Sequence, residues 1–218
     1  MLLLSARTID HLKESRFVAA LFVGIGLCLT CGWSACSSHG PVAYEEAEQE
    51  WREGDLALRC GWSKESRLIV AKGHSSYSHI GLLHYDSVAG WTVVHAVPDE
   101  DRPEYLKTEP VSVFWSAERA QLGAWMRIDC PDSVAAKAVQ YALAKVADKV
   151  LFDNAFLLQD TTRIYCTELV WRSYLSQGLD VTLGGRQRVP TMICKEGECI
   201  FPINIEQSET TLFIKPLN

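Results

Sequence analysis

The chain has 218 residues, of which 48% are hydrophobic and 22% are charged, and its formal net charge at pH 7 is -6. This composition supplies enough apolar side chains for one compact domain, and it excludes a collagen-like or broadly disordered chain. An acidic domain is poorly suited to holding a phosphate backbone, so nucleic acid is not an expected partner.

The first 35 residues are typical of an export signal. Lys13 and Arg16 precede an apolar run from Phe17 to Cys31. The run has about the length of a signal-peptide core and is shorter than the roughly 20 residues of a spanning helix. Small residues then precede Cys36, as in the lipobox of a bacterial lipoprotein signal. We expect lipidation at Cys36, with simple cleavage and an uncleaved anchor as alternatives.

These features divide the chain into a signal (residues 1–35), a tether (36–50) and one domain (51–218). The tether is polar and acidic, and Gly40-Pro41 favours a loop within it. The expected location is the bacterial cell envelope, where a lipid at the N-terminus would hold the domain on the periplasmic side of the membrane.

Hydrophobic alternation and β-branched residues predict several strands in the domain. The predicted strands are residues 56–60, 78–85, 91–97, 111–115 and 125–130, with 210–214 as a further strand at a sheet edge. Helical spacing predicts helices at 134–150 and 168–177, the second ending at Gly178. Asp55 precedes the first strand, where we expect it to bond backbone amides.

Two predicted strands carry histidines that a hairpin would bring together. With a turn centred near residues 87 and 88, the numbers of paired residues add up to about 174 to 176, and those of His79 and His95 add up to 174. We therefore expect the two imidazoles to be opposite or diagonal neighbours on one face. A shift of one residue would place them on opposite faces.

Cys166 lies where the second predicted helix opens, after Tyr165. Unpaired amides and the positive end of the helix dipole favour a thiolate there. The amide of Cys166 is also available to a developing oxyanion. A thiol nucleophile with a histidine base and an orienting third group is the arrangement that these residue types favour. Taken singly, each of the three is more often a structural side chain.

The domain retains five cysteines, which are Cys60, Cys130, Cys166, Cys194 and Cys199. In an oxidising compartment Cys194 could pair with Cys199 and Cys60 with Cys130, which would leave Cys166 as the free thiol. One alternative is that all five are small buried side chains. Another is a zinc site at Cys194 and Cys199, but no second pair of ligands is evident.

Five motifs cover about residues 51 to 180: Gly54-Asp55-Leu56, Ser78-His79-Ile80-Gly81, His95-Ala96-Val97, Phe152-Asp153-Asn154-Ala155-Phe156 and Tyr165-Cys166-Thr167-Glu168-Leu169-Val170. In this order they resemble the permuted papain-like amidase family, the YiiX/YaeF-like branch of the NlpC-type superfamily. The resemblance implies a circularly permuted α+β fold, in which an antiparallel sheet packs against helices and the cysteine lies at a helix N-terminus.

The resemblance also implies roles for three residues: Cys166 as nucleophile, His79 as base and His95 as the orienting third member. Many amidase relatives have Glu at the third position, so His95 is nearer to the pattern of lecithin retinol acyltransferase-like relatives. The first expected function is therefore an exported, membrane-anchored thiol hydrolase that cleaves an amide bond through an acyl-enzyme, with cell-wall peptide as substrate. The alternatives are an acyltransferase or lipid hydrolase with the same triad, and a non-catalytic binding module. No residue pattern requires a metal or organic cofactor.

Overall fold

The computed structural model describes residues 40–98, 104–190, 194 and 197–217. The predicted signal and Cys36 lie outside the described residues. Within the described part, no helix combines the length and apolarity needed to cross a membrane.

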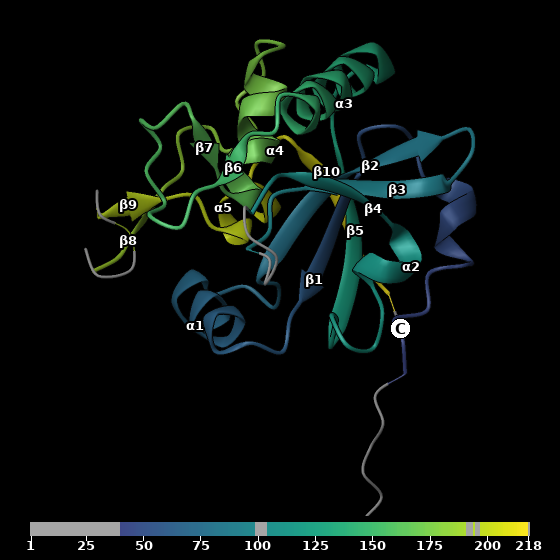
Figure 1. The fold of residues 1–218 in the computed structure, drawn as a ribbon, viewed down its shortest axis with the longest axis horizontal. Helices are drawn as coiled ribbons and strands as arrows, with labels where there is room; N and C mark the ends of the chain where they lie inside the picture. The colour runs from purple at the N-terminus through teal and green to yellow at the C-terminus, as the bar shows by residue number, and fades with distance from the viewer. Residues whose placement is uncertain (1–39, 99–103, 191–193, 195–196, 218) are drawn as a thin grey trace, which may run out of the picture. The chain divides into compact units, whose positions relative to one another are not determined.

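The described chain is a mixed α+β fold built on one antiparallel sheet with strand order β10-β5-β1-β2-β3-β4 (Figure 1). The strands are β1 (Leu56–Cys60), β2 (His79–Asp86), β3 (Gly90–His95), β4 (Lys107–Pro110), β5 (Leu122–Ile128) and β10 (Thr211–Leu217). The helices are η1 (Ala47–Glu50), α1 (Lys64–Gly73), α2 (Val111–Phe114), α3 (Asp132–Ala147), α4 (Cys166–Leu175) and α5 (Pro202–Glu206). Two short pairs join β6 (Leu151–Phe152) to β7 (Arg163–Ile164) and β8 (Gln187–Arg188) to β9 (Glu198–Cys199).

Alternating side chains of the central strands divide between two hydrophobic clusters, because successive residues of a strand point to opposite faces. On β1, Leu56 and Leu58 belong to the larger cluster, which includes buried residues of α3 and α4, whereas Ala57 belongs to the smaller one. The two helices contact each other over the first face (Figure 1). Residues of α2, together with Val42 and Trp51, cover the second face.

The strands expected at the centre and at the C-terminal edge of the sheet are present as β1, β2, β3, β5 and β10. The strand predicted at residues 111–115 is wrong, because this segment forms α2. Pro110 ends β4 there and offers no amide hydrogen to prolong a ladder. Val111 and Phe114, three residues apart, are both buried and so share one face of the short helix.

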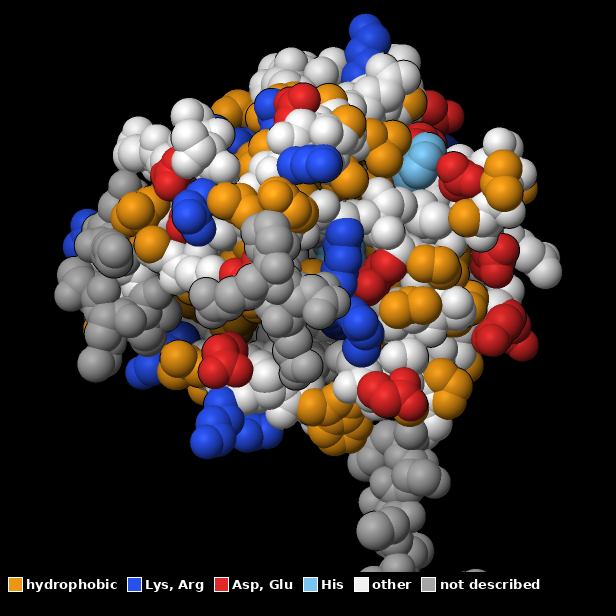
Figure 2. All heavy atoms as spheres, viewed as in Figure 1, with side chains coloured by type: hydrophobic (Ala, Val, Ile, Leu, Met, Phe, Trp, Pro, Cys, Tyr) orange, Lys and Arg blue, Asp and Glu red, His pale blue; other side chains and the backbone are white. Residues whose placement is uncertain are grey.

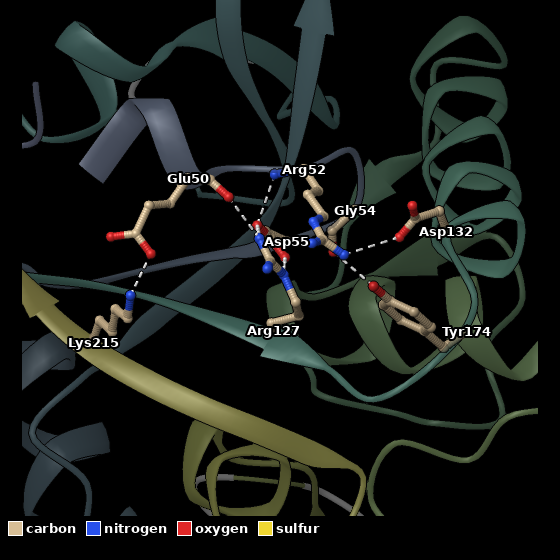
Figure 3. Close-up of polar contacts among 8 residues, drawn as sticks. All are labelled: Glu50, Arg52, Gly54, Asp55, Arg127, Asp132, Tyr174 and Lys215. Carbon is tan, nitrogen blue, oxygen red and sulfur yellow. Dashed lines mark hydrogen bonds and ion pairs between the residues drawn. The ribbon is translucent and has the colours of Figure 1, made fainter. Parts of the chain in front are cut away.

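Asp55 lies immediately before β1 and holds the start of that strand to its neighbours (Figure 3). Its carboxylate accepts hydrogen bonds from the amide of Arg52 at 2.8 Å and from Arg127 Nε and Nη2 at 2.7 and 2.6 Å. Beside it, Tyr174 Oη donates to the carbonyl of Gly54 at 2.6 Å. The backbone-bonding role expected for Asp55 is confirmed, and the same segment fixes the position of α4.

The predicted disulfide between Cys60 and Cys130 is wrong. Cys60 pairs with Leu122 at one end of β5, whereas Cys130 follows Ile128 at the other end. At about 3.3 Å per residue, roughly 20 Å or more separates the two cysteines, and a disulfide requires Cα atoms within about 7 Å. Both thiols are free.

The bond predicted between Cys194 and Cys199 is also absent, since both are free thiols. Cys194 Sγ instead lies 3.2 Å from the carbonyl oxygen of Phe156 and 3.1 Å from that of Glu198. Contacts with two carbonyl acceptors suit a sulfur that retains its hydrogen.

Charged and hydrophobic side chains are interspersed on the face of the described residues that Figure 2 shows. Acidic side chains gather at its right-hand edge, over the region where η1 and the turn between β2 and β3 lie in Figure 1.

Candidate active site

His79 and His95 contact each other across the β2–β3 hairpin. The ladder pairs Leu82 with Val94 and Asp86 with Gly90, so the numbers of paired residues add up to 176 and the two histidines are diagonal neighbours. His79 Nε2 lies 2.8 Å from His95 Nδ1, and both side chains are buried. The register therefore agrees with the one expected from the hairpin turn.

Gly81 provides the space that this contact needs. Continuing the ladder places His95 opposite Gly81. A Cβ atom on Gly81 would lie 2.8 Å from His95 Cβ and 2.5 Å from Val93 Cγ1, well inside van der Waals contact. His95 can pack across β2 toward His79 because residue 81 has no side chain.

Glu109 of β4 is a further member of the site that sequence reasoning missed. Its Oε1 lies 3.2 Å from His95 Nε2 and 3.6 Å from Arg59 Nη1, and its Oε2 lies 3.3 Å from Arg119 Nη1. Burial alone would raise the pKa of Glu109, but His95, Lys107 and Arg119 together lower it to about 2. A buried, ionised carboxylate therefore contacts His95, on the side of that ring away from His79.

The ionised carboxylate determines where the imidazole protons lie. Because it can only accept, the facing His95 Nε2 carries the hydrogen, and in a neutral ring His95 Nδ1 is then the acceptor. His79 Nε2 must donate to it, which leaves the lone pair on His79 Nδ1. Burial, the largest cause, lowers the pKa of His95 to about 4 against the effect of Glu109, and it lowers that of His79 well below 6.5. Both rings are neutral at pH 7.

Cys166 is the first residue of α4, and its thiol lies against β2. The ladder between β2 and β3 runs only to Leu82 and Val94, and beyond that end the backbone amide of Ile80 is close enough to the Cys166 sulfur to favour its thiolate. The amides of Thr167 and Cys166 itself also favour the thiolate. Ile80 directly follows His79, so the sulfur sits beside the backbone that carries the candidate base.

Burial dominates the ionisation of this thiol. It raises the pKa of Cys166 to about 11, because the loss of solvation outweighs the amides at the helix start and the charge of Arg59. The expectation that the helix N-terminus would favour a resting thiolate is therefore wrong for this enclosed state. At neutral pH the structure contains a neutral thiol beside a neutral imidazole pair.

The structure joins the two histidines directly but does not bond the thiol to them. The rings of His79 and His95 face Phe114 of α2, with centroids 5.7 and 5.3 Å from its ring. In the described part of the chain, no hydrogen bond links Cys166 Sγ to the His79 ring. The histidine pair thus packs against Phe114 on the sheet face covered by α2, whereas Cys166 belongs to the hydrophobic cluster on the other face, so the structure brings the two histidines together but not the thiol.

A small apolar pocket adjoins the thiol. It has a volume of about 30 Å³, and its lining includes Cys166, Ile69, Phe156, Ile200 and Phe201. Two hydrogen bonds hold its wall to the start of α4. Thr167 Oγ1 donates to the carbonyl of Ile200 at 2.6 Å, and the amide of Ile200 donates to Tyr165 Oη at 3.0 Å. The space is about that of one water molecule, so a substrate would have to widen it.

Replacing His95 with Gln should change how stability depends on pH. Between about pH 6.5 and 4 the unfolded chain binds a proton that buried His95 excludes, because the pKa of His95 is lowered to about 4, so His95 destabilises the fold as the pH falls. The measured quantity is the free energy of unfolding of the unmodified protein minus that of His95→Gln. We expect this difference to decrease by up to about 3 kcal/mol when the pH falls from 7 to 4. Urea unfolding of both proteins measures this difference.

The comparison cancels titrating groups that both proteins share and that do not contact His95. Burial raises the pKa of Glu168 to about 7, so its contribution has the opposite sign over the same range but is common to both proteins. A difference that stays constant with pH would show that His95 is not a buried neutral imidazole.

Comparison with known proteins identifies the fold. No family model and no curated protein matches the sequence. Among solved structures, the chain is similar to YiiX, described as a metalloprotein from Escherichia coli O157:H7, with a TM-score of 0.58 and 19% identity, covering 73% of this chain and 94% of that one. Among the residues that the structure describes here, no three His, Cys, Asp or Glu side chains are grouped to hold a metal ion. The chain thus has a YiiX-like α+β fold, with an antiparallel sheet packed against helices.

Proposed function

We propose that the protein is a papain-like thiol hydrolase in which Cys166 is the nucleophile, His79 the general base and His95 the orienting third member. One observation carries the proposal. A cysteine at a helix N-terminus lies against the amide that follows His79, and His79 is paired at 2.8 Å with a second buried histidine. The YiiX-like fold supports the papain-like assignment, and the circular permutation is part of the proposal.

In the proposed reaction, His79 Nδ1 accepts the proton of Cys166 as the sulfur attacks the carbonyl carbon of an amide. The new C–S bond forms an acyl-enzyme, and the amine leaves with the proton that His79 held. Water, activated in turn by His79, then hydrolyses the thioester and restores the thiol. In this proposal the backbone amide of Cys166 donates to the oxyanion of each step.

This sequence requires His79 to come within hydrogen-bonding reach of the sulfur. Because the His79 ring packs against Phe114 on the other face of the sheet, it would have to turn past the end of β2 to reach the sulfur. We propose that a substrate widens the 30 Å³ pocket when it binds and that His79 approaches the sulfur in the same step. A thiol with a pKa of about 11 is also a weak nucleophile without a base, which makes proton transfer to His79 the enabling step.

Glu109 is the proposed positioning residue behind the pair. Its Oε1 faces His95 Nε2 at 3.2 Å without an aligned hydrogen bond, and its negative charge favours the hydrogen on that nitrogen and so His95 Nδ1 as the acceptor for His79. A carboxylate stabilises an imidazolium far better than a neutral ring does. We therefore propose that His95 transmits the effect of Glu109 to His79.

The leading substrate class is an amide bond in cell-wall peptide, which rests on the resemblance of the motifs. One observation favours a second candidate, a lipid hydrolase or acyltransferase. The pocket beside the thiol is lined largely by apolar side chains, including Ile69, Phe156 and Phe201, which would suit an acyl chain better than a charged peptide.

Product analysis distinguishes these functions. The purified, reduced protein is incubated with peptidoglycan fragments or with phospholipid vesicles, and products are identified by mass spectrometry. We expect a new amine terminus in the peptide fragments. Cys166→Ala should lower the rate at least about 1000-fold, and Glu109→Gln about 10- to 100-fold. Cys60→Ser is the matched control and should leave the rate unchanged.

Cleavage of phospholipid in place of peptide would select the second candidate. If Cys166→Ala retained the rate of the unmodified protein, the proposed nucleophile would be wrong. Turnover of neither substrate by the folded protein would favour a binding module.

We also propose that the protein is exported and anchored to the membrane through a lipid on Cys36, on the periplasmic side. The support is the apolar run and the small residues before Cys36 in the sequence. Cells fed a clickable fatty acid should label the unmodified protein and not Cys36→Ala. Label retained by Cys36→Ala would reject this anchor.

A further inference from the structure

A second cavity lies on the side of α4 away from Cys166. It has a volume of about 650 Å³, and the residues that matter here are Trp171, Arg172, Leu175, Gln159, Thr161 and Arg186. At about 100° per residue, Trp171, Arg172 and Leu175 lie roughly 140°, 240° and 180° around the helix from Cys166, on its opposite face. We call this space the Trp171 cavity. Its size falls within the range of small-molecule sites.

One wall of the Trp171 cavity is the Trp171 indole, which is bonded to a turn organised by Asp180. The Asp180 carboxylate accepts hydrogen bonds from Trp171 Nε1 at 3.0 Å, from Thr182 Oγ1 at 2.7 Å and from the amide of Gly184 at 3.1 Å. These bonds fix the indole and the turn relative to each other. The wall is therefore organised before any ligand binds.

Arg186 lies over this indole. Its Cζ atom is 4.8 Å from the ring centroid of Trp171, and its Nη1 donates to Thr182 Oγ1 at 2.8 Å and to the carbonyl of Gly185 at 2.6 Å. Neither acceptor is charged. Among the residues that the structure describes, no carboxylate forms an ion pair with Arg186. Its charge is thus held in place without a counterion.

The other charged groups of the cavity are already paired. Arg172 is bonded to Glu168 Oε1 at 2.7 Å and to the carbonyl of Leu158 at 2.7 Å. Glu198 forms an exposed ion pair with Arg188 at 3.0 Å. Arg186 therefore supplies the unmatched charge of the cavity.

We propose that the Trp171 cavity binds a small organic anion whose carboxylate or phosphate pairs with Arg186. A planar guanidinium fixed by stacking offers parallel N–H groups to such an oxyanion. The indole and Leu175 supply apolar surface for the body of the ligand. This site is separate from the proposed catalytic thiol, so the test of anion binding does not depend on the proposed function.

The test is a binding titration of the full chain at fixed ionic strength. Benzoate and phenyl phosphate are the probes, and benzyl alcohol is the neutral analogue. Binding is followed by the NMR signal of the Trp171 indole N–H, which Trp171→Phe assigns. We expect saturable shifts with the two anions, with Kd in the millimolar range or below, and weak or no response to the alcohol.

Substitutions then test whether the charge of Arg186 is the one that binds the anion. Arg186→Gln should weaken anion binding at least about 10-fold, and Arg186→Lys should weaken it less because the charge remains. Lys137→Gln, which removes an exposed cation of α3 outside the cavity, should have no effect. No saturable shift with either anion up to roughly 10 mM, equal binding of benzyl alcohol, or equal losses in Arg186→Gln and Lys137→Gln would each overturn the proposal.

Discussion

The candidate site depends on one buried contact chain, from the Glu109 carboxylate through His95 to His79. Removing a carboxylate and two imidazoles from water is costly unless each polar atom finds a partner. The sheet meets this requirement in part: His79 bonds to His95, whereas His95 Nε2 and Glu109 Oε1 lie 3.2 Å apart without an aligned hydrogen bond. Glu109 stays ionised while both rings stay neutral, and this combination alone assigns the free lone pair to His79 Nδ1.

A second constraint is the fixed start of α4. Glu168 Oε2 accepts a hydrogen bond from the amide of Tyr165 at 3.2 Å, while Glu168 Oε1 pairs with Arg172. The phenol of Tyr165 and the hydroxyl of Thr167 both bond the backbone of Ile200. The first turn is thus held by its own cap and by the segment that walls the pocket. A nucleophile placed there would have little freedom to move, so substrate access must come from the pocket wall.

The hairpin with its histidines and the helix beginning at Cys166 could be predicted because local patterns determine them. Turn position sets the hairpin register, and helical spacing sets which side of α4 is buried. Glu109 could not be found in the same way. The sequence predicted a strand at 111–115, where the structure has α2, and it predicted no strand at β4, the actual neighbour of β3. Without β4, no strand register brings a carboxylate to His95.

The ionisation state of Cys166 could not be predicted from the sequence either. The helix N-terminus alone predicts a thiolate at Cys166, but burial contributed by distant segments reverses that preference. Similarly, counting cysteines suggested a pair between Cys60 and Cys130, whereas the β1–β5 register places them at opposite ends of a strand. Both errors arise from tertiary arrangement, which local patterns do not encode.

The most direct measurement of the central claim is the rate at which an alkyne-tagged iodoacetamide labels Cys166 in the folded, reduced protein between about pH 6 and 9. Peptide mass spectrometry identifies the labelled site. The account predicts labelling at Cys166 that slows at least about 10-fold in His79→Ala and is unchanged in Cys60→Ser. No labelling of Cys166 at any pH in this range, or labelling at the same rate without His79, would contradict it.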